Sequence, residues 1–228
     1  MQIIEAIESR HSVRSFSEKM PEKEILIQLE EEIKKINEKN DLHFQVVPGE
    51  EKAFSGFMAR YGKFSGVKNY IAVAGKNCSD LKEKCGYFGE HLVLLLQTLG
   101  LNSCWVSMTY SKIPGAFSLE KDEKLVALIP FGYGTTQGVP HKSKSFESVC
   151  EGLFQGKNGF SELPDWFERG VKAALLAPTA MNQQKFKFCL DGTKVTLKKG
   201  RGFETKIDFG IVKYHFEAAA GKENFSWN

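Results

Sequence analysis

The sequence predicts an α+β protein, because its 228 residues carry helical patterns together with short apolar strands, two of which are joined by a hairpin signal. Apolar residues recur at helical spacing from Ile25 to Ile36, and the charged cluster Glu30-Glu31-Glu32 faces away from them. Tyr70 to Ala74 is instead a short apolar run, which is typical of a central strand. Asp191-Gly192 between two apolar runs is a signal for a two-residue hairpin. Long helices combined with a strand hairpin favour the α+β class.

The remaining elements follow from apolar periodicity and from the residues that end each run. Pro48-Gly49 ends the first strand, and Gly132-Tyr133-Gly134 is a turn after the third. Phe88 to Leu99 is apolar on most sides, as expected of a buried helix. We expect helices over Ile3 to Glu8, from after Pro21 through Ile36, Phe88 to Leu99, Pro164 to Leu176 and Lys206 to Ala220. We expect strands over His43 to Val47, Tyr70 to Ala74, Leu125 to Phe131, Phe186 to Leu190 and Thr193 to Leu197.

Composition excludes several classes of protein. Apolar residues make up 42% of the chain and charged residues 26%, which is enough to build a core. Apolar runs such as Leu92 to Leu96 fall far short of the ~20 residues of a membrane span, and the N-terminus shows no signal-peptide core. The five cysteines form no Cys-x-x-Cys pair, so we expect no metal site and a reduced, cytoplasmic setting. The net charge is only +3, and the basic residues are interspersed with acidic ones, so we expect no nucleic-acid partner.

The chain is expected to form two halves within one compact domain. Gly, Gln, Lys and Asn dominate Gly152 to Gly159, which predicts a linker between residues 1–151 and 160–228. Phe88-Gly89 and Gly100 bracket one helix, and Phe209-Gly210 and Gly221 bracket another at the same spacing. These matches are compatible with an internal duplication and also with chance.

Two short segments carry the candidate chemistry. Residues 10–16 read Arg-His-Ser-Val-Arg-Ser-Phe directly after a helix. Guanidinium groups, hydroxyls and backbone N–H groups hold a phosphate, whereas an exposed basic turn that caps the helix is the plain alternative. Residues 177–184 read Ala-Pro-Thr-Ala-Met-Asn-Gln-Gln. Pro178 stops the preceding helix and Thr179 can cap a short turn, so an ordinary helix stop is the alternative here.

Both segments resemble signatures of the flavin-dependent nitroreductase family, Arg-Arg-Ser-Val-Arg-x-Phe and Ala-Pro-Ser-x-x-Asn-x-Gln-Pro-Trp. In ordinary members the two lie a few dozen residues apart, but here they lie at opposite ends of the chain. Residues 99–106 resemble the family's Gly-Leu-Gly-Ser-Cys-Trp-Ile, and residues 129–144 resemble Pro-x-Gly-Tyr-Pro followed by Lys-x-Arg. Departures are Asn102 for glycine, Lys144 for arginine, Thr179 for serine, and Lys185-Phe186 for Pro-Trp. The chain thus looks like a divergent branch with rearranged motifs.

The resemblance implies a mixed or antiparallel sheet flanked by helices, and one FMN held without a covalent bond. Arg10, His11 and Ser12 would contact its phosphate and ribityl chain, and Arg14 the pyrimidine side of the ring. Asn182 and Gln184 would fix their loop. The implied cofactor-binding residues are Arg10, His11, Ser12, Arg14, Trp105, Lys142, Lys144, Pro178, Thr179 and Asn182.

The implied activity is reduction of a nitroaromatic, quinone or similar small-molecule electron acceptor by NAD(P)H, with hydride passing through flavin N5. No side chain needs to act as a nucleophile: Arg14 gives electrostatic support beside the ring, and Cys104 is expected to be packing. Family members are typically intertwined homodimers with the flavin between subunits, so this chain is either a monomeric pseudo-dimer of two related halves or a homodimer. The alternatives are an FMN-binding protein without turnover and an interaction module without cofactor.

Overall fold

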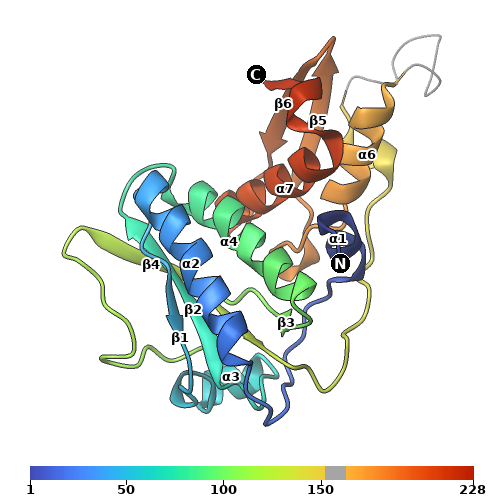
Figure 1. Ribbon diagram of the computed structural model, residues 1–228. Helices are drawn as coiled ribbons and strands as arrows, with labels where there is room; N and C mark the ends of the chain where they lie inside the picture. Colours follow the sequence, from blue (N-terminus) through green and yellow to red (C-terminus); the bar gives the residue numbers. More distant parts are fainter. Residues whose placement is uncertain (152–162) are drawn as a thin grey trace.

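Two sheets and a pair of long, crossing helices organise the protein in the computed structural model, which describes residues 1–151 and 163–228 (Figure 1). The larger sheet has the strand order β1-β2-β4-β3, and all its neighbours are antiparallel. The smaller sheet has the order β5-β6-β7, with β5 antiparallel and β7 parallel to β6. The strands are β1 (Gln45–Val47), β2 (Asn69–Lys76), β3 (Asn102–Ser103), β4 (Glu123–Gly132), β5 (Phe186–Asp191), β6 (Lys194–Lys199) and β7 (Ser226–Trp227). The predicted α+β class is confirmed.

The five predicted helices are all present, and Figure 1 shows α2 and α4 side by side across the larger sheet. The helices are α1 (Ile3–Ser9), α2 (Lys23–Asn40), α3 (Phe57–Tyr61), α4 (Leu81–Thr98), α5 (Phe146–Val149), α6 (Asp165–Ala174) and α7 (Thr205–Ala220). Short 3-10 turns lie at η1 (Lys52–Phe54), η3 (Ala180–Asn182) and η4 (Lys222–Asn224). Helix α4 begins well before the predicted Phe88, because its first turns carry partly buried charged residues that interrupt the apolar pattern.

Strand alternation gives the larger sheet two different buried faces. Ile71 and Val73 of β2 pack with helices α2 and α4 in one apolar cluster. Tyr70 and Ala72 point the other way, into a second cluster that contains Phe16 and the residues around η1 and α3. The N-terminal segment that follows α1 therefore lies against the face of the sheet opposite the helices.

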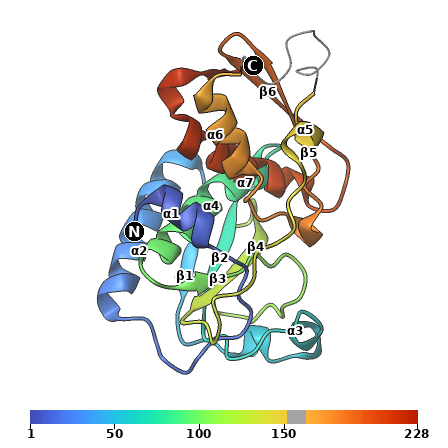
Figure 2. The same cartoon turned by 90° about the vertical axis from the view of Figure 1, so that its right-hand side faces the viewer.

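Helices α4 and α7 approach so closely that their backbones touch. A Cβ atom at Gly86 would overlap the carbonyl oxygen of Ile207, and one at Gly210 would overlap that of Glu83. Glycine is therefore required at both positions. Figure 2 shows the same helices from the side, with α7 packed between α4 and the smaller sheet. The two sequence halves meet along this helix pair, and their origin by duplication stays a prediction.

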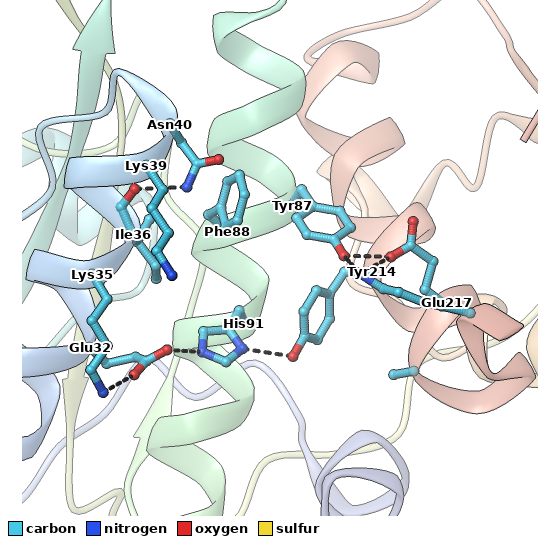
Figure 3. Close-up of a pocket in the computed structure, with 12 residues that line it drawn as sticks. Glu32, Lys35, Ile36, Lys39, Asn40, Tyr87, Phe88, His91, Tyr214 and Glu217 are labelled. Carbon is cyan, nitrogen blue, oxygen red and sulfur yellow. Dashed lines mark hydrogen bonds and ion pairs between the residues drawn. The ribbon is translucent and has the colours of Figure 1, made fainter.

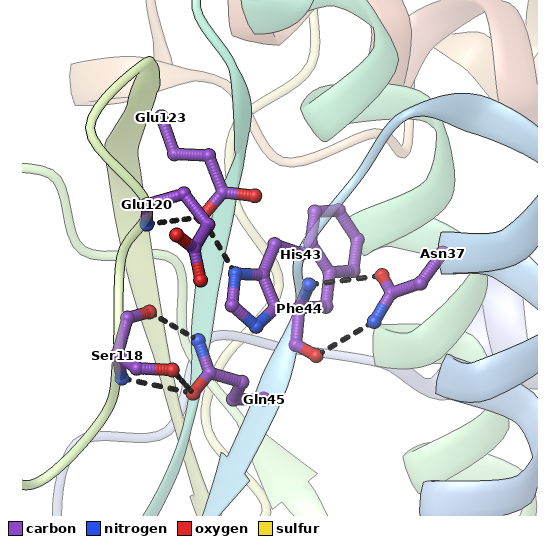
Figure 4. A network of polar contacts seen from close by, with 7 residues as sticks. All are labelled: Asn37, His43, Phe44, Gln45, Ser118, Glu120 and Glu123. Carbon is purple, nitrogen blue, oxygen red and sulfur yellow. Dashed lines mark hydrogen bonds and ion pairs between the residues drawn. The ribbon is translucent and has the colours of Figure 1, made fainter.

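The edge strand β1 begins two residues later than predicted, for a reason seen in Figure 4. Asn37 of α2 donates a side-chain hydrogen bond to the carbonyl of Phe44 and accepts one from its N–H, each at 2.9 Å. These bonds take the place of strand pairing at Phe44. Next to it, His43 Nδ1 lies 2.6 Å from Glu123 Oε2, and the Gln45 side chain bonds the backbone of Ser118. Side chains thus attach the end of this short edge strand to its neighbours.

The predicted hairpin is confirmed: β5 and β6 are antiparallel, Asp191 pairs with Lys194, and Gly192 has φ +58°. Phe188 of β5 stacks on Phe216 of α7 with ring centroids 4.9 Å apart. The predicted linker, Gly152 to Gly159, lies outside the described residues. Within residues 1–151 and 163–228, no helix is both long and apolar enough to cross a membrane.

Candidate flavin pocket

The two motif segments from opposite ends of the chain line one cavity of about 120 Å³. Its walls come from the segment after α1, the passage from β3 toward β4, the turn before β5, and the first turns of α7. The lining residues are Ser12, Arg14, Cys104, Trp105, Val106, Ser107, Ala127, Pro178, Thr179, Ala180, Met181, Glu204, Ile207, Asp208 and Ile211. The fold therefore brings together what the sequence separates.

The N-terminal segment runs as an extended chain along the sheet, and this decides which side chains face the cavity. Ser12 forms a parallel bridge with Ser103, and the Val13 N–H donates to the Ser103 carbonyl at 3.0 Å. Successive side chains of an extended chain point to opposite sides. Val13 is buried in the core, so Ser12 and Arg14 face the other way, into the cavity. The guanidinium of Arg14 lies 5.9 Å from the ring centre of Phe64.

Trp105 forms the wall on the side of helix α4. A Cβ atom at Gly89 would overlap the indole, so the ring lies directly on the helix backbone. The indole N–H donates to Glu90 Oε2 at 2.8 Å. Val106 continues the wall, because its backbone exchanges two hydrogen bonds with Leu128 of β4. Helix, glycine and carboxylate thus fix the orientation of one aromatic side chain.

The third wall is the turn Thr179–Gln184, which is held by side chains. Asn182 Nδ2 and Gln184 Nε2 both donate to the carbonyl of Lys142, at 2.9 and 2.8 Å. The Thr179 hydroxyl accepts from the N–H of Gln184 at 3.1 Å rather than capping the 3-10 turn, which differs from the sequence expectation. Met181, Asn182 and Gln184 all have positive φ, between 44° and 52°. Such conformations cost about 1–3 kcal/mol each and persist only where the surroundings impose them.

Asp208 of α7 holds the same turn, and sequence reasoning does not find it. Its Oδ1 accepts from the N–H of Ala180 at 2.9 Å, and its Oδ2 from Gln183 Nε2 at 2.8 Å. Burial raises the pKa of Asp208 to about 6, although these two bonds oppose the shift. The available signal was an acidic residue between Ile207 and Phe209 in the first turn of an apolar helix.

Half of the ten predicted cofactor-binding residues line the cavity, namely Ser12, Arg14, Trp105, Pro178 and Thr179. The others, Arg10, His11, Lys142, Lys144 and Asn182, lie outside its lining. Arg10 is only 4% exposed, and its Nε lies 3.9 Å from Glu90 Oε1. Lys144 Nζ donates to the carbonyl of Gln184 at 2.8 Å, so its ammonium is already paired with backbone.

A cationic corner lies beside the cavity, where His11 follows Arg10. Burial lowers the pKa of His11, and the nearby charges of Arg10 and His141 lower it further. His141 is held by a 3.0 Å contact between its Nε2 and the carbonyl of Leu175. The exposed Lys142 follows directly in the chain. The charge of Lys142 and the N–H groups of the two imidazoles can together hold an anion. Cys104 lines the cavity but is buried, and burial raises the pKa of its thiol, which disfavours the reactive thiolate.

A second cavity, of about 430 Å³, lies between α2, α4 and α7 (Figure 3). Its polar side chains bond one another: His91 lies 3.0 Å from Glu32 and 2.7 Å from the Tyr214 hydroxyl. None of the described residues that line it belongs to the two motif segments. We therefore take the smaller cavity as the candidate functional site, because residues of both motif segments line it.

Comparison with known proteins assigns the chain to a class of oxidoreductases. Residues 2–220 match the model of the family described as "Putative TM nitroreductase". The chain belongs to this nitroreductase family. No curated protein shows a significant sequence match.

Solved structures of nitroreductase-type proteins share the fold. A protein from Thermotoga maritima described as a "putative nitroreductase" is 26% identical, with a TM-score of 0.67 over 96% of this chain and 83% of that one. A "Putative NADH dehydrogenase/NAD(P)H nitroreductase" from Bacteroides thetaiotaomicron is 21% identical, with a TM-score of 0.51 over 64% and 95% of the two chains. A "putative nitroreductase in complex with fmn" from Desulfovibrio desulfuricans is 17% identical, with a TM-score of 0.52 over 65% and 95%. The last two show likeness of fold alone.

Proposed function

We propose that the protein is an FMN-dependent NAD(P)H oxidoreductase that reduces nitroaromatic, quinone or similar small-molecule acceptors. The observation that carries the proposal is the meeting of Ser12 and Arg14 with Pro178 and Thr179 around one cavity. These residues come from the two segments that resemble the flavin-binding signatures. Family membership and a fold shared with a protein solved with FMN support the same cofactor.

The residues of the cavity fit a flavin in their chemistry. Trp105, Pro178 and Ile211 offer flat and apolar surface for an aromatic ring, and Ser12 and Arg14 offer donors for its polar edge. A cavity of about 120 Å³ encloses only part of such a molecule, since pockets for ligands of that size measure about 300–1,000 Å³. The rest of the cofactor would extend over exposed residues outside the cavity.

The phosphate end fits the cationic corner. His11, His141 and Lys142 lie at or beside the N-terminal motif, and a phosphate dianion is held by such donors. Asn182 and Gln184 act indirectly, because they fix the backbone of Lys142. The predicted contact of Lys144 with phosphate stays a prediction, and it requires its bond to the Gln184 carbonyl to break.

When bound, FMN would supply the hydride-transfer chemistry at its N5 atom, so the chain needs no nucleophile of its own. The task of Arg14 is to present a permanent positive charge to the ring, where preorganised charge stabilises a developing anion. Trp105 and the turn at Thr179, which both line the cavity, would orient the ring and shield one side of it from water. We infer a cytoplasmic enzyme because the five cysteines are odd in number and form no Cys-x-x-Cys pair, which argues against a disulfide framework.

The test is to load the purified protein with FMN and to follow NADH and NADPH oxidation with a quinone and with a nitroaromatic acceptor. We expect flavin uptake, and turnover that depends on both the nucleotide and the acceptor. Uptake without oxidation of either nucleotide would show an FMN-binding protein without turnover. A protein that takes up no FMN would refute the flavin assignment.

A further inference from the structure

A buried cluster of charged side chains lies directly behind the Trp105 wall, outside the cavity itself. Glu90 of α4 and His215 of α7 are fully buried. Glu90 Oε2 accepts the hydrogen bond from the Trp105 indole at 2.8 Å. Glu90 Oε1 lies 2.8 Å from His215 Nε2 and 3.9 Å from Arg10 Nε. One carboxylate thus touches the pocket wall, an arginine of the N-terminal motif, and helix α7.

The contacts of His215 fix the number of protons that it shares with Glu90. Its Nδ1 lies 3.0 Å from the carbonyl oxygen of Ala173, and a carbonyl only accepts, so Nδ1 carries a proton. The 2.8 Å contact between Nε2 and Glu90 requires a second proton, because two lone pairs would repel at that distance. The second proton resides either on Nε2, facing a carboxylate, or on Glu90, facing a neutral imidazole.

The other partners of Glu90 indicate that it is the ionised carboxylate and that the second proton resides on His215. The indole N–H of Trp105 and the guanidinium of Arg10 both favour the charged form of Glu90. Arg10 Nε is buried without a hydrogen-bond partner, and among the described residues Arg10 has no other ion pair. A neutral Glu90 would leave a buried guanidinium without a counter-charge, which is strongly destabilising. His215 is then protonated on both ring nitrogens.

We propose that Glu90 is a positioning residue of the candidate pocket, which as a carboxylate fixes the Trp105 indole and the Arg10 guanidinium and keeps His215 doubly protonated. The Nε atom of Arg10 faces Glu90, so the carboxylate sets the orientation of the guanidinium group. The role toward a flavin rests on the proposed function. The protonation of His215 and the placement of Trp105 do not depend on it.

The Glu90→Gln variant tests whether the negative charge of Glu90, and not only its hydrogen bonds, is required. A glutamine oxygen can still accept from Trp105, and its amide can donate to a His215 that has lost its second proton. The variant therefore preserves both hydrogen bonds and removes only the charge. Glu83→Gln is the matched control, because Glu83 also joins α4 to α7, through Lys213, but its side chain is partly exposed whereas that of Glu90 is fully buried.

The experiment measures the ring-nitrogen NMR resonances of His215 and the indole N–H resonance of Trp105 in the apoprotein, and then FMN affinity by fluorescence titration. In the wild type and in E83Q we expect two protonated nitrogens on His215. In E90Q we expect one, with a shifted indole resonance and about tenfold weaker FMN binding.

A neutral His215 in the wild type would overturn the proposal even if E90Q does not fold. An E90Q variant with unchanged His215, Trp105 and FMN affinity would also overturn it. If the wild type binds no FMN, the proposed function fails, and the two sets of resonances alone decide the role of Glu90.

Discussion

Asp208 accepts a hydrogen bond from the backbone N–H of Ala180 at 2.9 Å, and this bond ties the turn of the second motif to helix α7. The carboxyl lines the candidate pocket, and its partner Gln183 is tied in turn to the carbonyl of Phe203. A buried carboxyl thus determines the shape of one wall. Its ionisation should be measurable as a pH-dependent stability.

We expect the stability of the apoprotein to fall, relative to the Asp208→Asn variant, as the pH rises. Burial raises the pKa of Asp208 from 3.8 to about 6, so between these values the folded state binds more protons than the unfolded chain. The wild type therefore carries no penalty below about pH 3.8, a growing penalty as the pH rises from there to about 6, and a constant penalty above that. The difference should change by about 2 kcal/mol between about pH 4.5 and about pH 8.

Urea unfolding of both proteins at the two pH values measures this change. Asp122→Asn, at an exposed loop position, serves as the control and should show no such trend. A constant difference between wild type and D208N across the range would contradict the prediction.

Removal of the Arg14 guanidinium should weaken FMN binding. A hydrogen bond to a charged group contributes about 1.5–3 kcal/mol, so Arg14→Ala is expected to lower affinity by about 10- to 100-fold. Arg201→Ala removes an exposed arginine of the loop after β6 and should leave affinity unchanged. Fluorescence titration of the apoproteins measures both. Equal affinities in the two variants would remove Arg14 from the site.

Each chain should bind one FMN, because Ser12 and Thr179 of the same chain line the same cavity. Flavin absorbance per protein, measured together with the solution mass, tests this. One flavin in a monomer would support the pseudo-dimer, whereas one flavin per chain in a dimer would support the enzyme and leave the duplication open. Half a flavin per chain would contradict a site completed within one chain.

Local pattern predicted the helices, the hairpin and the two motif segments, since each depends on residues close together in the chain. Arg14 and Pro178 line the same cavity only because α4 packs against α7, and the apolar periodicity of a sequence does not predict which helices pack together. The sequence gives no sign of the roles of Asp208 and Glu90, because an acidic residue in a helix usually faces solvent. Only the fold shows that both are buried.

Gly210→Ala should destabilise the protein, although alanine normally stabilises a helix interior by about 0.5–1 kcal/mol relative to glycine. The added Cβ atom would overlap the carbonyl oxygen of Glu83, so α4 and α7 would have to separate. We expect a loss of about 1–3 kcal/mol, as for other overpacked cores. The midpoint of urea unfolding gives the sign directly, and a stabilised variant would show that the two helices do not touch.

Asn37→Ala should cost more than a surface change on the same helix. Asn37 satisfies both the N–H and the carbonyl of Phe44, which is 1% exposed, and no strand pairing replaces these bonds. Leaving buried backbone groups unpaired costs about 1–3 kcal/mol per group, so we expect a loss of about 2 kcal/mol or more. Gln28→Ala, at an exposed position of α2, is the control and should change stability by less than about 0.5 kcal/mol. If urea unfolding gives similar values for the two variants, then Asn37 does not set the start of β1, and the strand would be free to begin at His43 as the sequence alone predicts.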